Sequence, residues 1–208
     1  AAFDYIQFWE GSFPIVGNDK QVGIQEIART AYRSDLMPDG MELGLFETDT
    51  FVPSGPTFPN GCHVVEVEID PQTGVAEVLN YSVTDDVGTV INELTLEGQV
   101  HGGIGQGVGQ AFSEQIVYDE SGQLITGSFL DYGMPRAGDM CSFDLDNNPV
   151  PTKLNPLGAK GAGEAGNVGA LAAIMNAVVD ALAPLGIQNL DMPATPENVW
   201  RAIQNAEA

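Results

Sequence analysis

The segment VEVEIDPQTGVAEVLNYSV (residues 65–83) has the clearest structural pattern in the chain. Val65, Val67 and Ile69 alternate with acidic residues, DPQTG follows, and apolar residues then alternate again. Alternation of this kind is typical of half-buried strands, and a turn that contains Pro and Gly between two such runs is typical of a hairpin. The pattern predicts an antiparallel strand pair with one face turned towards a core.

The segments around this hairpin predict further short strands and helices. Apolar residues at helical spacing indicate a helix over residues 23–32 and a longer one after residue 164, and Thr195 followed by Pro196 indicates the start of a last helix. The other expected segments are a β element over 6–16, an irregular connection over 38–61, a second hairpin over 114–126 and a mostly loop region over 131–156.

The expected fold class is α+β, in which hairpins form a mainly antiparallel sheet and the helices pack on one side of it. With 43% hydrophobic residues among 208, the chain can bury a core in one or two domains. Residues 1–208 are interpreted as one region, which the irregular connection over 38–61 can divide into two subdomains.

The charge balance excludes one class of partner. Seven basic residues against 29 acidic ones give a formal net charge of −22, which repels nucleic-acid phosphates and anionic lipid headgroups. The acidic residues are spread along the chain, so they form either the solvated surface of a soluble protein or a surface for a basic partner. We therefore expect no nucleic-acid partner.

The apolar runs and the two cysteines indicate the setting in which the chain functions. No uninterrupted apolar run approaches the ~18 residues of a membrane-spanning helix, so no membrane span is expected. Cys62 and Cys141 have neither CxxC spacing nor a histidine cluster beside them. This pattern indicates neither a zinc site nor a disulfide framework, and it favours a reduced, cytoplasmic setting with no metal held by protein side chains.

Glu164 lies in GAKGAGEAG (residues 158–166), where it is the one carboxylate among several glycines before an apolar helix. Glycine lets backbone N–H groups approach a ligand, and a helix N-terminus favours an anion. The pattern suits a reactive site, or a carboxylate that caps its own helix. Residues 161–166 also fit G-x-G-x-x-G, but no strand precedes them and no acidic residue ends a following strand, which argues against a dinucleotide site.

The glycine-rich segment EGQVHGGIGQGVGQAF (residues 97–112) is unusual for a helix, because each glycine costs up to ~1 kcal/mol of helix stability relative to alanine. Something must require close approach to this backbone. The sequence leaves two explanations open, which are a ligand packed against the segment and tight packing against another helix or a sheet.

Short motifs run in a fixed order along most of the chain: TDDVGTVIN at 84–92, EGQVHGG at 97–103, GQG at 105–107, DY and PR within 131–136, NPLG at 155–158 and KGAGE at 160–164. Together they resemble the molybdenum-binding large subunit of the xanthine dehydrogenase/aldehyde oxidase family, and in particular its carbon monoxide dehydrogenase-like bacterial members. The likeness is to the C-terminal part of such a subunit. Val87 and Glu93 depart from the pattern, since many relatives have cysteine and proline there.

The resemblance implies a molybdenum–molybdopterin cofactor, in its plain or cytosine dinucleotide form, and a hydroxylation of an aldehyde, an N-heterocycle or a related small substrate with oxygen from water. Glu164 matches the family's catalytic glutamate, which acts as general base. The positions that match cofactor-binding residues are Gln106, Gly102, Gly103, Lys160, Gly161, Ala162 and Gly163. Lys160 could instead be solvated, and His101 is interpreted as a hydrogen-bonded structural histidine.

The implied partners are the N-terminal half of the same subunit, an iron–sulfur subunit and an FAD subunit, in a complex that forms a dimer. The alternative is a non-catalytic assembly domain, or a remnant, that binds no cofactor. The cofactor site that the resemblance implies requires the Gln106 and Glu164 loops to lie close together in the fold.

Overall fold

The computed structural model describes residues 5–207 and divides the chain into two compact units, residues 1–52 and 53–208. The smaller unit contains β1 (Ser12–Pro14), β2 (Gln21–Gly23) and α1 (Ile24–Ala31), and β1 pairs with β2 in antiparallel orientation. The β element and the helix predicted for this part of the chain are therefore present.

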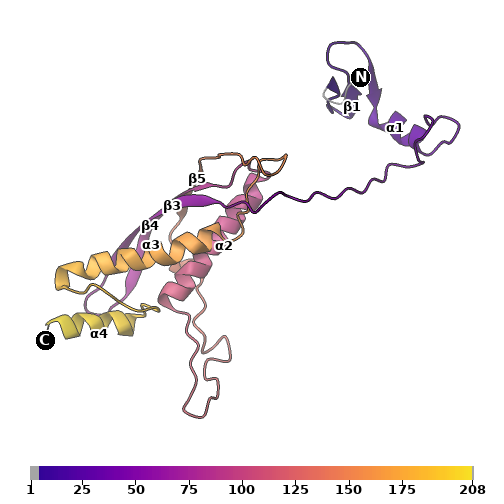
Figure 1. Cartoon of the computed structure of the whole chain (residues 1–208). Coiled ribbons are helices and arrows are strands. Elements are labelled where there is room, and N and C mark those ends of the chain that lie inside the picture. Colours follow the sequence, from indigo (N-terminus) through magenta and orange to yellow (C-terminus); the bar gives the residue numbers. More distant parts are fainter. Residues whose placement is uncertain (1–4, 208) are drawn as a thin grey trace. The chain divides into compact units, whose positions relative to one another are not determined.

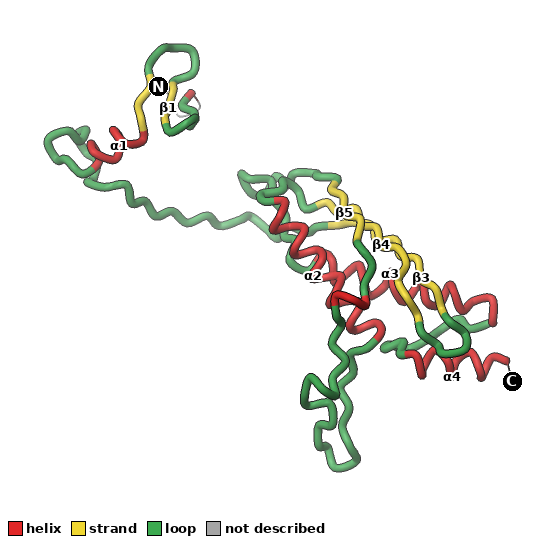
Figure 2. The backbone as a smooth tube through the Cα atoms, turned by 180° about the vertical axis from the view of Figure 1, so that it is seen from behind, coloured by secondary structure: helices red, strands yellow, loops and turns green. Residues whose placement is uncertain are grey.

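The larger unit contains β3 (Asn60–Ile69), β4 (Ala76–Asp86), α2 (Glu93–Phe112), η2 (Ala137–Asp139), β5 (Phe143–Asn147), α3 (Ala165–Leu182), η3 (Ala183–Leu185) and α4 (Pro196–Glu207) (Figures 1 and 2). The predicted hairpin is confirmed, since β3 and β4 pair in antiparallel orientation from Ile69 opposite Ala76 to Asn60 opposite Asp86. Its turn is closed by the Gly74 N–H, which donates to the Asp70 carbonyl over 2.7 Å.

The region over 131–156 is mostly loop, as predicted, but it also contains the short strand β5, which the sequence pattern did not indicate. β5 pairs with β4 in parallel orientation, which gives a three-stranded sheet in the order β3-β4-β5. The expected second hairpin is present in short form: Tyr118 and Leu124 form a bridge, the Ile125 N–H donates to the Val117 carbonyl over 2.8 Å, and the Asp119 N–H donates to the Gln123 carbonyl over 3.0 Å. Figures 1 and 2 show this segment extending away from the helices as a long loop.

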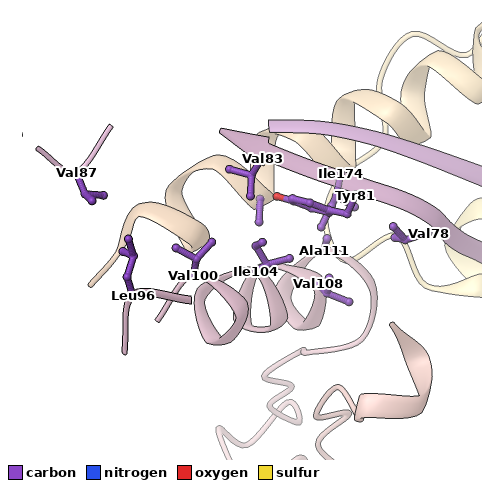
Figure 3. Packing of buried hydrophobic residues seen from close by; sticks show 11 residues of the cluster. Val78, Tyr81, Val83, Val87, Leu96, Val100, Ile104, Val108, Ala111 and Ile174 are labelled. Atoms are coloured by element: carbon purple, nitrogen blue, oxygen red, sulfur yellow. The ribbon is translucent and has the colours of Figure 1, made fainter. Parts of the chain in front are cut away.

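The helices cover one face of the three-stranded sheet. Along β4, Val78, Tyr81 and Val83 are buried, whereas Ser82 between them and Thr84 after them are exposed. The buried side chains meet those of α2 and α3, and the main cluster comprises Val78, Tyr81, Val83, Val87, Leu96, Val100, Ile104, Val108, Ala111, Ala170 and Ile174 (Figure 3). The α+β class with helices on one side is thus confirmed, with the parallel strand β5 as an addition.

A second apolar cluster fixes the C-terminal helix. Val199 and Ile203 of α4 are buried against Val178 and Leu182 at the end of α3. The Thr195 hydroxyl accepts a hydrogen bond from the Asn198 N–H over 3.3 Å, which confirms the predicted N-cap. Gly186 ends η3 with a φ of 81°, a left-handed conformation that glycine adopts without strain.

The helix α3 packs one face against the core, and its composition is strongly apolar. Its continuation to Leu185 is long and apolar enough to cross a membrane by length and composition alone, with a mean hydropathy of 1.8. Polar residues such as Asn176 and Asp180 interrupt the apolar run, so the sequence pattern did not reveal this. Ala170, Ile174 and Val178 are fully buried in the two clusters described above, but only 22% of the apolar stretch is buried, so α3 packs one narrow face against the core.

Glycines set the distance between α2 and α3. A Cβ added at Gly103 would lie 2.8 Å from the Asn167 nitrogen and 3.0 Å from Gly166 Cα, and one at Gly107 would lie 2.5 Å from the Ala170 Cβ. Real Cβ atoms do not approach neighbours this closely, so both positions need glycine at the present helix separation. Of the two explanations for the glycine-rich segment, helix packing therefore holds for Gly103 and Gly107.

We expect Gly107→Ala to lower the free energy of unfolding by about 1–3 kcal/mol, because the new methyl group overpacks the α2–α3 contact. The matched control is Gly98→Ala on the same helix, where an added Cβ meets no atom within 4 Å. There, alanine should raise the free energy of unfolding by up to ~1 kcal/mol through helix propensity. Urea unfolding followed by circular dichroism measures both, and equal effects would contradict the glycine contact.

Candidate functional site

Asp86, at the end of β4, connects three segments of the chain through its carboxylate. Its Oδ1 accepts hydrogen bonds from the backbone N–H groups of Gly88 and Val150, each over 2.9 Å, and its Oδ2 accepts one from Lys160 Nζ over 2.5 Å. The two side chains of the ion pair are 10% and 12% exposed. The Lys160 ammonium, followed by the two backbone N–H groups, holds the pKa of Asp86 well below its usual range.

Backbone contacts fix the same loop from both sides. The Thr89 N–H donates to the Gly158 carbonyl over 3.0 Å, and the Lys160 N–H donates to the Val87 carbonyl over 2.8 Å. Gly158 has a φ of 72°, so the close approach of the two segments depends on a left-handed residue there. The loop that leads to Glu164 is therefore a fixed structure.

Glu164 occupies the residue before α3 and has an exposed side chain. It makes no side-chain hydrogen bond to the N–H groups of its own helix, so the capping interpretation is not what the structure shows. The carboxylate lies instead in the lining of a cleft of about 630 Å³, together with Gly161, Gly163, His63 and Asp85. It has acceptor capacity for a ligand at the positive end of a helix.

The α2–α3 contact brings the Gln106 segment next to the Glu164 segment, as expected. Gly103, one turn before Gln106, meets Gly166, two residues after Glu164. The Gln106 side chain is exposed on α2. The two segments thus lie close together, but the residues that line the cleft include Glu164 and neither Gln106 nor Gly102.

The glycines predicted to contact a cofactor divide into two groups. An added Cβ would meet no atom within 4 Å at Gly102, Gly161 or Gly163, so a ligand can approach the backbone there. Gly103 is buried, and the position that a Cβ would occupy lies against α3, so this glycine is needed for the contact between the two helices. Ala162 is partly buried against the core cluster, which leaves its backbone as the group available to a ligand.

Lys160 and His101 have structural partners. The Lys160 ammonium pairs with Asp86, so the lysine is not solvated, and its contact with a cofactor phosphate stays a prediction. His101 Nδ1 lies 2.8 Å from the Glu97 carbonyl oxygen one turn earlier, and its ring centroid is 5.5 Å from that of Phe143. Both contacts fit the structural role predicted for His101. Among residues 5–207, no three His, Cys, Asp or Glu side chains are grouped so that they could hold a metal ion.

Sequence reasoning missed the roles of Asp85, Asp86 and His63. Asp85 and Asp86 are only 4% and 8% exposed. The sequence signal that could have revealed them is the presence of two adjacent acidic residues at the end of a strand whose one face is apolar. Their partners are distant in sequence, since Lys160 lies 74 residues after Asp86. His63 had no signal, because it takes an ordinary inward position in the alternation of β3.

Comparison with known proteins agrees with this arrangement. The family model of the molybdopterin cofactor-binding domain matches residues 2–141. The chain is 40% identical over 195 residues to the nicotine 6-hydroxylase large subunit of Paenarthrobacter nicotinovorans, covering 93% of this chain and 24% of that protein. It is 35% identical over 198 residues to the carbon monoxide dehydrogenase large chain of Hydrogenophaga pseudoflava, covering 94% and 24%.

The crystal structure of quinoline 2-oxidoreductase from Pseudomonas putida 86 has the same fold, with a TM-score of 0.89 and 37% identity over 98% of this chain and 26% of that one. The chain belongs to the molybdopterin cofactor-binding domain family. The resemblance inferred from its motifs is thereby confirmed. The chain spans about a quarter of the length of the relatives that it matches.

The Asp86 ion pair predicts a pH dependence of stability. A carboxyl whose pKa is lowered by folding stabilises the fold above its unfolded pKa of about 3.9, and this contribution is lost as the pH falls towards the folded pKa. We expect Asp86→Asn to be less stable than the natural chain at pH 7, because Lys160 loses its buried partner. The stability difference should narrow as the pH falls below about 4.

Urea unfolding at a series of pH values measures this difference. Asp180→Asn removes the same charge from an exposed position on α3 and serves as the control. A difference between Asp86→Asn and the natural chain that is the same at every pH would show that the ion pair does not contribute as proposed.

Proposed function

We propose that this chain is the C-terminal part of the catalytic subunit of a molybdenum hydroxylase, in which Glu164 is the general base. The observation that carries the proposal is the uncapped, exposed carboxylate of Glu164 in the lining of the cleft, at the start of α3. Family membership supports a molybdopterin cofactor beside it. The enzyme would oxidise an aldehyde, an N-heterocycle or a related small substrate with oxygen from water.

The residues at the site fit a pterin cofactor. Gly161 and Gly163 line the cleft and leave space at their Cα atoms, so their backbone groups can contact a flat ligand. Gly102 has the same open space but lies with Gln106 on α2, outside the residues that line the cleft, and the contact of both with the cofactor is part of the proposal. The exposed amide of Gln106 both donates and accepts hydrogen bonds, as the edge of a pterin ring requires. When bound, the cofactor supplies the redox chemistry of the hydroxylation, in its plain or cytosine dinucleotide form.

Glu164 would supply the acid–base chemistry. A general base must be ionised and must have a free acceptor position that reaches the proton it removes. Neither carboxylate oxygen of Glu164 accepts a capping hydrogen bond from its own helix, and the positive end of α3 favours the anionic form of the side chain. The ion pair of Lys160 with Asp86 anchors the backbone four residues before Glu164, and Glu164 lines the cleft. It can therefore take up a proton from the attacking group and release it once the product leaves.

The complete enzyme would include more protein than this chain. The printed names of the relatives are those of large subunits or large chains, and each is about four times as long as this chain, which covers 24% of its length. We propose that the rest of the same subunit completes the cofactor site. An iron–sulfur subunit and an FAD subunit would carry the electrons away, in a dimeric cytoplasmic complex.

Gln106→Ala in the complete subunit should lower the amount of molybdenum cofactor retained after purification, because one side-chain contact to the pterin is lost. Gln110→Ala is the matched control, since it is the same change on the same helix one turn further on, also at an exposed position. Elemental mass spectrometry measures molybdenum per subunit. Equal molybdenum content in the two variants would contradict the role of Gln106.

Glu164→Gln should lower kcat by about 10²–10⁴-fold while molybdenum content and fold are preserved, because the amide keeps the shape and loses the basic oxygen. The control is Glu77→Gln, an exposed glutamate on β4 outside the cleft. Steady-state kinetics with a panel of aldehydes and N-heterocycles gives the comparison. A fully active Glu164→Gln enzyme, or a native subunit that binds no cofactor, would favour the non-catalytic assembly domain instead.

A further inference from the structure

A buried polar cluster lies under the cleft that Glu164 lines, and the proposed chemistry does not use it. It comprises His63 of β3 with Tyr81 and Asp85 of β4. His63 Nδ1 is 2.6 Å from the Tyr81 hydroxyl, and His63 Nε2 is 3.7 Å from Asp85 Oδ1. The side chains of His63 and Asp85 are only 6% and 5% exposed, and Tyr81 is 1% exposed. Figure 3 shows Tyr81 inside the core, with its hydroxyl oxygen in red.

The surroundings of this cluster keep the Tyr81 hydroxyl protonated. Burial, together with the charge of Asp85, raises the pKa of Tyr81 above its usual value, so its hydroxyl keeps its proton. The hydroxyl and His63 Nδ1 share a hydrogen bond, and His63 Nε2 faces Asp85 on the other side of the ring. The ring is thus held in one orientation from both sides.

Two glycines make room for the cluster. A Cβ at Gly169 of α3 would overlap the ring atoms of His63, and a Cβ at Gly61 of β3 would overlap the Asp85 carboxylate. A glycine inside a helix costs about 0.5–1 kcal/mol relative to alanine. The fold therefore gives up stability at α3 so that an imidazole can lie directly against the backbone of that helix.

We propose that His63 is a positioning residue for Glu164, which acts by supporting the start of α3 at the bottom of the cleft. Gly169 is five residues after Glu164, about 7–8 Å along a rigid helix. His63, Asp85 and Glu164 line the same cleft. A ring fixed by Tyr81 and Asp85 therefore sets where the first turns of α3, and with them the Glu164 backbone, lie relative to the sheet.

The cluster also has one acceptor left over. Within residues 5–207, Asp85 Oδ2 is buried and has no hydrogen-bond partner. A buried carboxylate oxygen without a donor is costly, so this atom has acceptor capacity for a donor that binds in the cleft. A ligand that donates to Asp85 Oδ2 would then contact the same cluster that supports the start of α3 and Glu164.

The test is Tyr81→Phe in the complete, cofactor-loaded enzyme, which removes the hydroxyl and keeps the ring in the core. We expect kcat to fall about tenfold with KM unchanged, because small displacements of a catalytic group are costly. We also expect faster amide hydrogen exchange, by mass spectrometry, in residues 163–169. Tyr132→Phe is the matched control, since it removes a tyrosine hydrogen bond of 2.9 Å, to Glu114, away from the cleft.

A second pair of variants separates positioning from packing. His63→Asn keeps an acceptor for the Tyr81 hydroxyl, whereas His63→Ala does not, so His63→Asn should retain more of the kcat and more of the exchange protection. Unchanged kcat and exchange in Tyr81→Phe, or equal losses in the two His63 variants, would overturn the inference.

The inference rests on Glu164 as the base, and the two can fail separately. A fully active Glu164→Gln enzyme would remove the proposed function, while the exchange of residues 163–169 still reports whether the cluster supports α3. If Glu164→Gln is inactive and Tyr81→Phe changes neither kcat nor exchange, only the role of His63 fails.

Discussion

The carboxylate of Asp86 is the contact on which the geometry of the site depends most. It accepts hydrogen bonds from backbone groups after β4 and before the Glu164 loop, and it pairs with Lys160 within that loop. The chain has only seven basic residues and a net charge of −22, and one of these few, Lys160, is shielded from solvent in an ion pair with Asp86. The pair connects the end of the sheet to the loop, and the loop begins the helix that carries the site.

The second constraint is the glycine contact between α2 and α3. It fixes how far apart the two helices lie, and so it places the Gln106 and Glu164 segments together. Both constraints give up local stability, since glycine weakens helices and buried charges are costly to desolvate. The apolar core, in which Ile104 and Ile174 are fully buried, offsets this loss of stability.

Parts of this architecture could be predicted from the sequence and parts could not. The β3–β4 hairpin and α3 follow local periodicity, and the glycines around Glu164 gave a local chemical signal. The strand β5 has only five residues and a parallel partner distant in sequence, so no local pattern revealed it. The sequence left open whether the α2 glycines serve packing or a ligand, because both need a missing Cβ. The partners of Asp86 and His63 are long-range contacts, which only the folded chain brings together.

The most direct test of the central claim is the molybdenum content of the native complex that contains this chain, measured by elemental mass spectrometry after purification from its source. The account predicts about one molybdenum atom per copy of this chain, together with co-purifying iron. A complex that contains the intact chain, is free of molybdenum and cannot be loaded with cofactor would contradict it.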